Sequence, residues 1–336
     1  MHFRKYSTIE NTYLTSFLDK IKTEGYDQME YVVQEKIHGS NVCIITDGQV
    51  IQFAKRTEII EDEASFFRIN QLREKYSEKI FSLFSSLKQE FDINSLSIFG
   101  EYFGGYYPHI NIKKDPLAKT VQKGVCYLQK NEFYAFDILL NNHIYLDVDT
   151  SNHLFHEFGF FYAESLFRGN LQDSLNYQND FQSTIPHKFK LPIIEDNTCE
   201  GVIIRPVKPI FLSNGSRVLL KNKNEKWSEI SKRTDKHRSP KIQHENKTLS
   251  NECTELIIEL ETYITLNRLQ NIQSKHGILD LQKDFGKLMG LYSMDVLEEF
   301  LKMKASNYVA LDKSEQKILT KELTAMVKAF LKSIAG

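Results

Sequence analysis

Long apolar runs are missing from this sequence. No stretch of about 18 consecutive apolar residues occurs among its 336 residues, so the sequence predicts no membrane-spanning helix and no membrane contact. Residues Met1 to Tyr6 also lack the apolar core of a secretory signal. We therefore expect a cytoplasmic protein.

Cysteine is scarce, and so is net charge. Cys43, Cys126, Cys199 and Cys253 show no Cys-x-x-Cys spacing, which argues against a zinc site or a disulfide framework and favours reduced thiols. Forty-three lysines and arginines nearly balance 44 aspartates and glutamates, for a net charge of −1. Overall charge gives no sign of nucleic-acid binding, so any such surface must be local.

A lysine at the end of a predicted strand is the main chemical signal. Residues 31–33 are apolar and β-prone, and Glu35-Lys36-Ile37-His38-Gly39-Ser40-Asn41 follows them. An ordinary lysine has a pKa of about 10.4, and partial burial with nearby cations frees the amine to attack phosphorus. A glycine in the segment lets backbone approach a ligand closely. A solvated surface turn explains the same few residues, so that alternative stays open.

The segments around this lysine predict a mixed fold. Asp47-Gly48 joins two strands into a hairpin, whose return strand carries Lys55-Arg56-Thr57 back towards the lysine. Arg56 then either faces a phosphate or is a solvated turn residue. Apolar residues recur at helical spacing over 7–25, 61–91 and 164–178, which predicts helices there. Phe66-Phe67 belongs either to the core or to a nucleic-acid surface.

Four later strands carry residues suited to nucleotide binding. These residues are Glu101, Phe136, Glu200, Arg205, Lys221 and Lys223. Glu101 stands where a strand breaks at glycines and can hold a ribose hydroxyl, and Phe136 can stack on a purine. Lys221 and Lys223 share one face by the two-residue period of a strand, as phosphate contacts would. An outward-facing glutamate, a core phenylalanine and an exposed basic edge are the structural alternatives.

The composition changes beyond residue 226. From Lys226 to Lys247 basic residues outnumber acids, which is typical of a mobile basic linker. From about residue 248 apolar residues recur at helical spacing. We predict a first domain over 1–240, with the linker near its end, and a separate α-helical domain over 248–336.

Taken in order, these segments resemble the covalent nucleotidyltransferase superfamily, and within it the double-strand RNA ligases of the phage RNA ligase 2 type. The matching segments are Lys36–Asn41 (nucleophile), Ala54–Thr57, Phe99–Tyr102 (ribose), Phe133–Asp137 (adenine), Glu200–Pro206 and Arg217–Lys223. Thr265–Arg268 and Lys283–Leu291 resemble the C-terminal domain of the phage branch. Two residues depart from the pattern: Ser40 stands for threonine and Arg205 for lysine.

The resemblance implies an α+β fold: an N-terminal nucleotidyltransferase domain of ATP-grasp-like antiparallel sheets with flanking helices, and an all-α C-terminal domain that engages RNA. The implied catalytic residues are Lys36 (the nucleophile that becomes AMP-lysine), His38, Arg56, Lys221 and Lys223. The implied nucleotide-binding residues are Glu35, Ile37, Asn41, Arg56, Glu101, Phe136, Glu200, Arg205, Lys221 and Lys223. Implied RNA contacts are Ser40, Phe66, Phe67 and Arg217, and Glu200 is the implied metal ligand, directly or through water.

The implied activity is that of an ATP-dependent RNA ligase. It would seal 3′-OH/5′-phosphate nicks in duplex RNA during RNA repair, using ATP and Mg²⁺, with Mn²⁺ as a substitute. The expected partners are nicked double-stranded RNA and an RNA/DNA hybrid, and the expected state is a monomer from a viral or bacterial source. A DNA ligase and an mRNA-capping guanylyltransferase share the core fold but usually carry a small β-barrel after it. A non-catalytic RNA-binding protein would not need Lys36.

Overall fold

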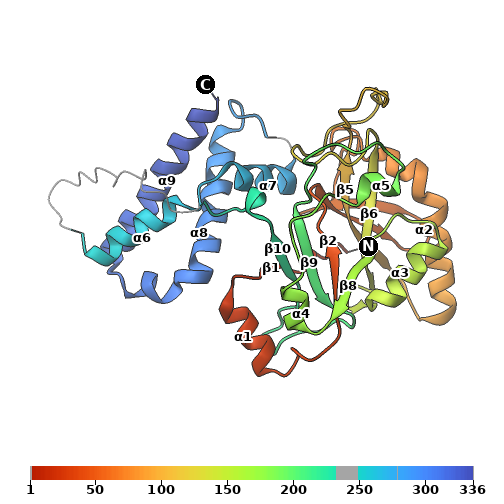
Figure 1. Ribbon diagram of the computed structural model, residues 1–336, viewed down its shortest axis with the longest axis horizontal. Helices are drawn as coiled ribbons and strands as arrows, with labels where there is room; N and C mark the ends of the chain where they lie inside the picture. Colours follow the sequence, from red (N-terminus) through yellow and green to blue (C-terminus); the bar gives the residue numbers. More distant parts are fainter. Residues whose placement is uncertain (1, 232–248, 278, 336) are drawn as a thin grey trace. The chain divides into compact units, whose positions relative to one another are not determined.

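The computed structural model describes residues 2–231, 249–277 and 279–335 (Figure 1). The chain divides into two compact units, Met1–Lys226 and Trp227–Gly336, called here the N-terminal and C-terminal units. Most of the predicted basic linker lies outside the described residues. The predicted limits of the two domains, at 240 and 248, therefore stay a prediction.

Two five-stranded sheets build the N-terminal unit. The first has the order β1-β10-β9-β2-β8, formed by Glu10–Asn11, Leu220–Lys223, Gly201–Pro206, Tyr31–Glu35 and Ser165–Gly169. The second has the order β4-β3-β5-β6-β7, formed by Ile51–Lys55, Ser40–Thr46, Leu96–Gly104, Asn131–Leu140 and Ile144–Tyr145. Strand β1 pairs parallel with β10, and the other pairs are antiparallel.

Helices cover these sheets through apolar faces. The long helix α2 (Asn70–Glu90) and α3 (Val148–Glu157) pack on the second sheet, where Ile80 and Phe155 share a core with Ile44 (Figure 1). Helix α1 (Thr15–Thr23) and α4 (Leu171–Leu175) pack on the first sheet. The short helices α5 and η1 span Ile185–Lys188 and Glu225–Trp227.

A third apolar cluster draws on both sheets. It joins Tyr6 of the N-terminal segment with Cys43 and Phe99 of the second sheet and with Leu219, next to β10 of the first. Apolar side chains thus tie the inner faces of the two sheets together, and the N-terminal segment belongs to that layer.

Three predicted helices differ from the structure, and in two of them strand pairing between distant segments outweighs local propensity. The helix predicted over 7–25 begins only at Thr15, since Glu10–Asn11 pairs with β10. The helix predicted over 61–91 begins at Asn70, after Phe67 and Arg68 with positive φ of 49° and 56°. The helix predicted over 164–178 is wrong in its first half, which forms β8 and pairs with β2.

The C-terminal unit is helical, as predicted. Helices α6 (Asn251–Glu261), α7 (Leu266–His276), α8 (Phe285–Ala310) and α9 (Lys313–Ala335) enclose one core of leucine, valine and aromatic side chains. Among the described residues, no helix combines the length and the apolar character needed to cross a bilayer.

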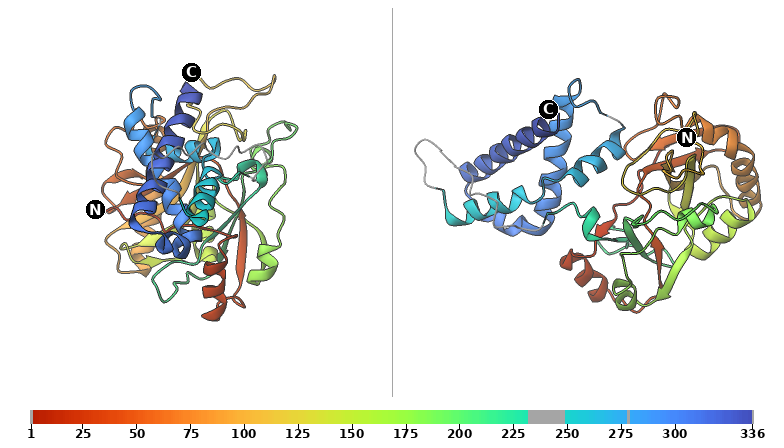
Figure 2. Two further views of the ribbon diagram at one scale, coloured as in Figure 1. Left: turned by 90° about the vertical axis from the view of Figure 1, so that its left-hand side faces the viewer. Right: turned by 45° about the horizontal axis from the view of Figure 1, so that its top comes forward.

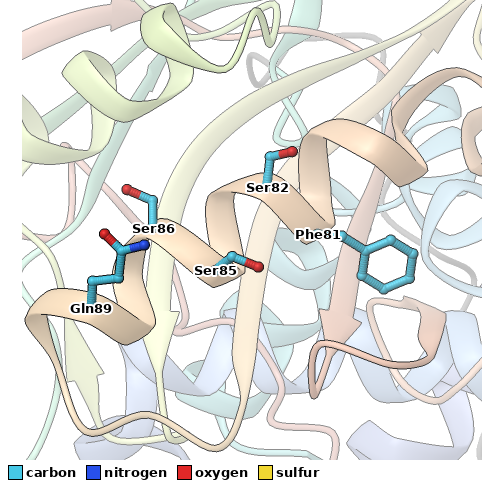
Figure 3. Close-up of a pocket in the computed structure, with 5 residues that line it drawn as sticks. All are labelled: Phe81, Ser82, Ser85, Ser86 and Gln89. Atoms are coloured by element: carbon cyan, nitrogen blue, oxygen red, sulfur yellow. The ribbon is translucent and has the colours of Figure 1, made fainter.

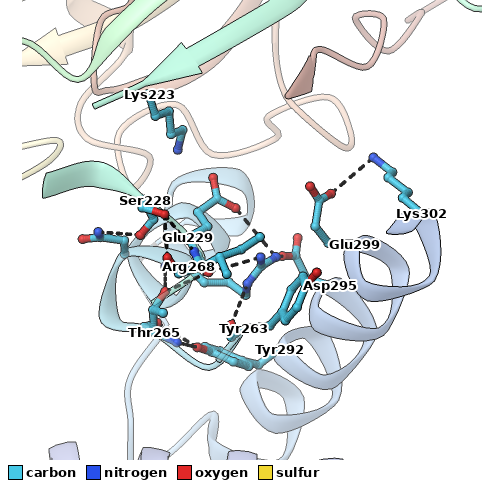
Figure 4. Close-up of polar contacts among 12 residues, drawn as sticks. Lys223, Ser228, Glu229, Tyr263, Thr265, Arg268, Tyr292, Asp295, Glu299 and Lys302 are labelled. Atoms are coloured by element: carbon cyan, nitrogen blue, oxygen red, sulfur yellow. Dashed lines mark hydrogen bonds and ion pairs between the residues drawn. The ribbon is translucent and has the colours of Figure 1, made fainter. Parts of the chain in front are cut away.

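A buried arginine organises the C-terminal unit. Arg268 of α7 pairs with Asp295 of α8 at 2.7 Å, and its Nε donates to the carbonyl of Tyr263 at 2.9 Å (Figure 4). Thr265 caps α7 by accepting from the Arg268 amide, and Tyr292 donates to the Thr265 carbonyl. The predicted motif Thr265–Arg268 therefore acts as a junction between helices.

We expect Arg268→Ala to lower the free energy of unfolding by about 2 to 3 kcal/mol. The loss is moderate because Asp295 keeps a second partner, the Lys275 amine at 2.6 Å. Lys275→Ala is the matched control: its side chain is 41% exposed, so it should cost less than about 1 kcal/mol. Urea unfolding of the full chain measures both, and equal losses would contradict the assignment.

Candidate active site

Three segments meet around Lys36 because their strands are antiparallel neighbours. The Lys36 amide donates to the Gly201 carbonyl at 3.0 Å, and Lys223 is in register with Gly201. The two lysine amines therefore lie at one edge of the first sheet beside Glu200. Lys36 Nζ is 2.7 Å from Glu200 Oε2, Lys223 Nζ is 2.8 Å from Oε1, and His38 Nδ1 is 3.4 Å from Oε2.

Glu200 is a buried carboxylate held between two ammonium groups. Burial alone would raise its pKa, but the charges of Lys223 and Lys36 hold the pKa of Glu200 well below its ordinary value. Burial lowers the pKa of His38, so the imidazole beside Glu200 is neutral at pH 7. The site thus pairs one fixed negative charge with two cations.

Two glycines are required for this arrangement. A Cβ on Gly39 would lie 2.4 Å from the Tyr102 carbonyl oxygen, so only glycine lets this segment pass so close to β5. Gly201 has φ of +141°, and a Cβ there would lie 2.2 Å from the Asn222 carbonyl oxygen. Gly39 thus lets the segment lie close to a neighbouring strand, and its close approach to a ligand stays a prediction.

A pocket between the two sheets collects most of the predicted nucleotide contacts. Six of the ten line it, Glu35, Ile37, Asn41, Glu101, Phe136 and Arg205, together with the predicted nucleophile Lys36. Tyr6 and Ile9 of the N-terminal segment also line it. Its volume is about 70 Å³, below the roughly 300 Å³ at which ligand pockets begin, so a nucleotide must widen it on binding.

Larger hollows lie elsewhere on the N-terminal unit, and Lys36 lines neither of them. One of about 420 Å³ is lined by Phe81, Ser82, Ser85, Ser86 and Gln89 on the outer side of α2 (Figure 3). None of these five side chains is ionisable at neutral pH, so the hollow has no catalytic group.

Glu101 is the half-buried acid that the second sheet contributes to the pocket. Its Oε1 accepts a hydrogen bond from the Gly39 amide at 3.1 Å. Burial raises the pKa of Glu101 to about 7, against the lowering effect of Lys36 and with a further raising effect of Glu200. The carboxyl group predicted to hold a ribose hydroxyl therefore changes charge near neutral pH.

This raised pKa predicts a pH-dependent stability. The ordinary value is 4.5, so the folded state holds the Glu101 proton more tightly than the unfolded chain does. Its stabilising effect is full below pH 4.5 and is lost as the pH rises through 7. Relative to Glu101→Gln, the parent should lose up to about 3 kcal/mol of unfolding free energy between pH 4.5 and 8.

Urea unfolding at a series of pH values measures that difference. The matched control is Glu78→Gln, because Glu78 is exposed on α2. Parent and Glu101→Gln curves that stay parallel across the range would show that Glu101 titrates normally.

The carboxylate of Glu35 is occupied by donors of the protein itself. It accepts hydrogen bonds from Ser183 Oγ at 2.6 Å, the Thr184 amide at 2.9 Å and Thr184 Oγ1 at 2.6 Å. Burial raises the pKa of Glu35, and these donors oppose the rise. In this form Glu35 anchors the segment before α5, and a nucleotide contact by its carboxylate stays a prediction.

Asp137 is the residue that sequence reasoning missed. Its buried carboxylate binds Arg205 Nη2 at 3.0 Å, Arg217 Nη1 at 2.6 Å and Tyr6 Oη at 2.8 Å. Arg205 also donates to the Phe136 carbonyl at 2.9 Å. The signal available in the sequence was the presence of two arginines on strands that otherwise look buried, which calls for a buried acid.

Arg205 and Arg217 therefore have protein partners in this form. Arg205 lines the pocket, and together with Asp137 it fixes the strand that carries Phe136. Arg217 has a side chain only 1% exposed and lies over the Tyr145 ring at 3.7 Å. A direct RNA contact by Arg217 is closed off in this conformation, and that role remains a prediction.

Two of the remaining predicted residues, Arg56 and Lys221, are basic. Arg56 follows β4, with its guanidinium 3.5 Å from the Ser7 carbonyl, and burial lowers its pKa. Lys221 lies on β10, in register with Ile203, one strand from the pocket wall. Arg56 thus lies beside the N-terminal segment, and Lys221 lies on the strand next to Ile203 of the pocket wall.

The predicted RNA contacts lie deeper. Ser40 is fully buried at the start of β3. Phe66 and Phe67 belong to the core of the second sheet, with ring centroids 5.1 Å apart. Their structural alternative, core packing, is what this form shows, and RNA contact by these three residues stays a prediction.

Comparison with known families supplies the identification. Residues 29–223, more than half of the chain, match the family model described as RNA ligase. The chain belongs to the RNA ligase family. Residues 246–329 match the model described as T4 RNA ligase 2 C-terminal. The predicted RNA ligase 2 type, with its mixed α+β fold and its helical C-terminal region, is confirmed, and an ATP-dependent RNA ligase is the enzyme class of this family.

Relatives of this RNA ligase include two proteins of Trypanosoma brucei brucei. Mitochondrial RNA-editing ligase 2 is 26% identical over an alignment 352 residues long, gaps included. The alignment covers 89% of this chain and 83% of that protein. Mitochondrial RNA-editing ligase 1 is 29% identical over 229 residues, 57% of this chain and 48% of that protein. The solved Naegleria gruberi RNA ligase with PPi shares 14% identity at a TM-score of 0.44, covering 67% and 57% of the two chains. The chain thus spans about half the length of the last two proteins.

Proposed function

We propose that this RNA ligase seals 3′-OH/5′-phosphate nicks in duplex RNA through a lysyl-AMP intermediate. The observation that carries the proposal is Lys36: its amine contacts buried Glu200 and lines a pocket shared with Glu101 and Phe136. Phe136 would stack on the adenine, and Glu101 would hold a ribose hydroxyl. An RNA substrate agrees with the name of RNA-editing ligase 2, a relative that is similar over most of this chain.

In the first step Lys36 Nζ attacks the α-phosphorus of ATP. A nitrogen–phosphorus bond forms, the bond from phosphorus to the bridging oxygen breaks, and pyrophosphate leaves. The amine must first give up the proton that it donates to Glu200. Lys223 and Lys221 would then neutralise the negative charge that builds up on phosphate oxygens.

Glu200 fits a role in holding Mg²⁺. Among the described residues, no cluster of three or more histidine, cysteine or acidic side chains is present that could hold a metal by protein ligands alone. Mg²⁺ is commonly bound through one or two carboxylates together with substrate phosphates and water, which is what a single buried carboxylate offers. When bound, the ion would polarise the phosphate and stabilise the leaving group.

The second and third steps pass AMP to the RNA and then release it. A 5′-phosphate oxygen of the RNA attacks the lysyl-AMP phosphorus, and Lys36 is regenerated. The adjacent 3′-hydroxyl then attacks the RNA phosphate, and AMP leaves as the phosphodiester bond forms. A nick in a duplex holds both ends together and so supplies the proximity that this last step requires.

The helical C-terminal unit would engage the backbone of the duplex through phosphate and 2′-OH contacts. Use of an RNA/DNA hybrid, the monomeric state and the cytoplasmic location remain predictions.

A sealing assay tests the proposal directly. Purified protein, ATP and Mg²⁺ are incubated with nicked duplex RNA, single-stranded RNA or nicked duplex DNA, and product length is followed on a denaturing gel. Preferential joining of nicked duplex RNA is expected. Joining of DNA alone would indicate a DNA ligase, and protein labelling by GTP rather than ATP would indicate a capping enzyme. RNA binding without label from either nucleotide would favour a binding protein.

A further inference from the structure

The loop between β5 and β6, residues 105–130, has a strong local charge. It contains five lysines and a single acid, Asp115, in a chain whose net charge is −1. The five lysines are Lys113, Lys114, Lys119, Lys123 and Lys130. Such a local excess of positive charge attracts polyanions where the chain as a whole does not.

These lysines are available to a ligand. All five are exposed, and no carboxylate of the described residues pairs with any of them. Asp115, the one acid nearby, uses its Oδ1 to accept from the Leu117 amide at 2.8 Å and so shapes the loop. The positive charge of the loop is therefore left unneutralised by the rest of the described chain.

Exposed aromatic and aliphatic side chains accompany the lysines of the loop. Tyr106 is 50% exposed, Leu117 58% and Ile110 97%. A solvated charged loop has no need of such side chains at its surface. Lysines interleaved with a tyrosine suit a nucleic acid, whose phosphates pair with the ammonium groups and whose bases or sugars pack on the ring.

The base of the loop is tied to the active site. The Tyr127 hydroxyl accepts a hydrogen bond from the His38 amide at 2.8 Å, within the nucleophile segment. The side chain of Asn197 both donates to and accepts from the backbone of Cys126, at 2.7 and 2.8 Å. These bonds hold the base of the loop in place without a ligand, which lowers the entropy cost of binding there.

The loop also projects from the body of the N-terminal unit. Figure 1 and the left view of Figure 2 show this gold-to-olive segment extending beyond the ends of the strands. Its tip is therefore free to meet a large ligand while its base contacts the Lys36–Gly39 segment.

We propose that the 105–130 loop binds the sugar–phosphate backbone of the RNA that flanks the nick. This inference rests on the proposed function, since it names the element by which the N-terminal unit grips its substrate. Lys113 and Lys114 at the tip contact phosphates, and Tyr106 packs against the strand. The contact is sequence-independent and salt-sensitive.

The test compares two double variants of the full chain. Lys113→Ala/Lys114→Ala removes the tip charges, and Lys20→Ala/Lys22→Ala removes two exposed lysines of α1, which lies at the opposite end of the unit (Figure 1). Affinity for a labelled nicked RNA duplex is measured without ATP by fluorescence anisotropy at several salt concentrations. In parallel, label transfer from ATP to the protein is measured without RNA.

The tip variant should bind the duplex about tenfold more weakly at moderate salt, and its plot of log affinity against log salt should be shallower by about 2. The α1 control should match the parent. Unchanged affinity and slope in the tip variant would overturn the proposal and leave an acidic protein surface as the partner to test. Absence of label in every protein would instead overturn the proposed function, so the two failures are distinct.

Discussion

Replacement of Lys36 by alanine should reduce formation of protein-bound AMP by more than about 1,000-fold. The reason is chemical: in the described chain, no other amine both pairs with Glu200 and lines the pocket. Lys223 also reaches Glu200, but it does not line the pocket. The measurement is transfer of label from α-labelled ATP to protein in the absence of RNA.

Lys36→Arg is the matched control for this variant. Arginine keeps a positive charge against Glu200 and so preserves the ion pair, yet it does not deprotonate and cannot form the intermediate. Both variants should therefore be inactive, while the arginine form retains the parent's thermal stability. Label above a tenth of the parent's in either variant would point to a different nucleophile.

Replacement of Asp137 by alanine should lower the free energy of unfolding by about 3 to 5 kcal/mol. Its carboxylate is fully buried and neutralises Arg205 and Arg217, whose side chains are 2% and 1% exposed. Removing it leaves two guanidinium groups in the interior without their counter-charge. Urea unfolding at neutral pH measures the loss.

Tyr6→Phe is the control that separates charge from hydrogen bonding. It removes only the hydroxyl that donates to Asp137, so it should cost about 1 to 3 kcal/mol. Burial would raise the pKa of Asp137, but Arg205 and Arg217 hold it below its ordinary value. The stabilising effect is therefore present above the ordinary pKa near 4 and is lost as the pH falls below it. A loss in Asp137→Ala no larger than in Tyr6→Phe would contradict this account.

Local patterns were enough to predict much of the fold. The Asp47-Gly48 turn and the alternation around it predicted the β3–β4 hairpin, because both signals act over a few residues. The later strand predicted to carry Phe136 corresponds to β6. Pairing between distant segments was beyond those patterns. The apolar spacing over 7–25 suggested a helix from residue 7, whereas the parallel pairing of β1 with β10 keeps Glu10 extended.

The same limit applies to the active site. Lys36, Glu101, Phe136 and Arg205 were assigned to one nucleotide site from their order in the sequence, and in the structure they line one pocket. Residue type does not say which partner a buried side chain finds. The Glu35 carboxylate accepts hydrogen bonds from Ser183 and Thr184, which lie 148 and 149 positions further along the chain.

The most direct test of the central claim is to locate the nucleotide on the protein. The full chain is incubated with ATP and Mg²⁺, denatured, digested and analysed by mass spectrometry. The account predicts AMP in a phosphoramidate bond on Lys36 alone, removed when pyrophosphate is added before denaturation. AMP on another lysine, or none on a protein shown to be free of bound AMP at the start, would contradict it.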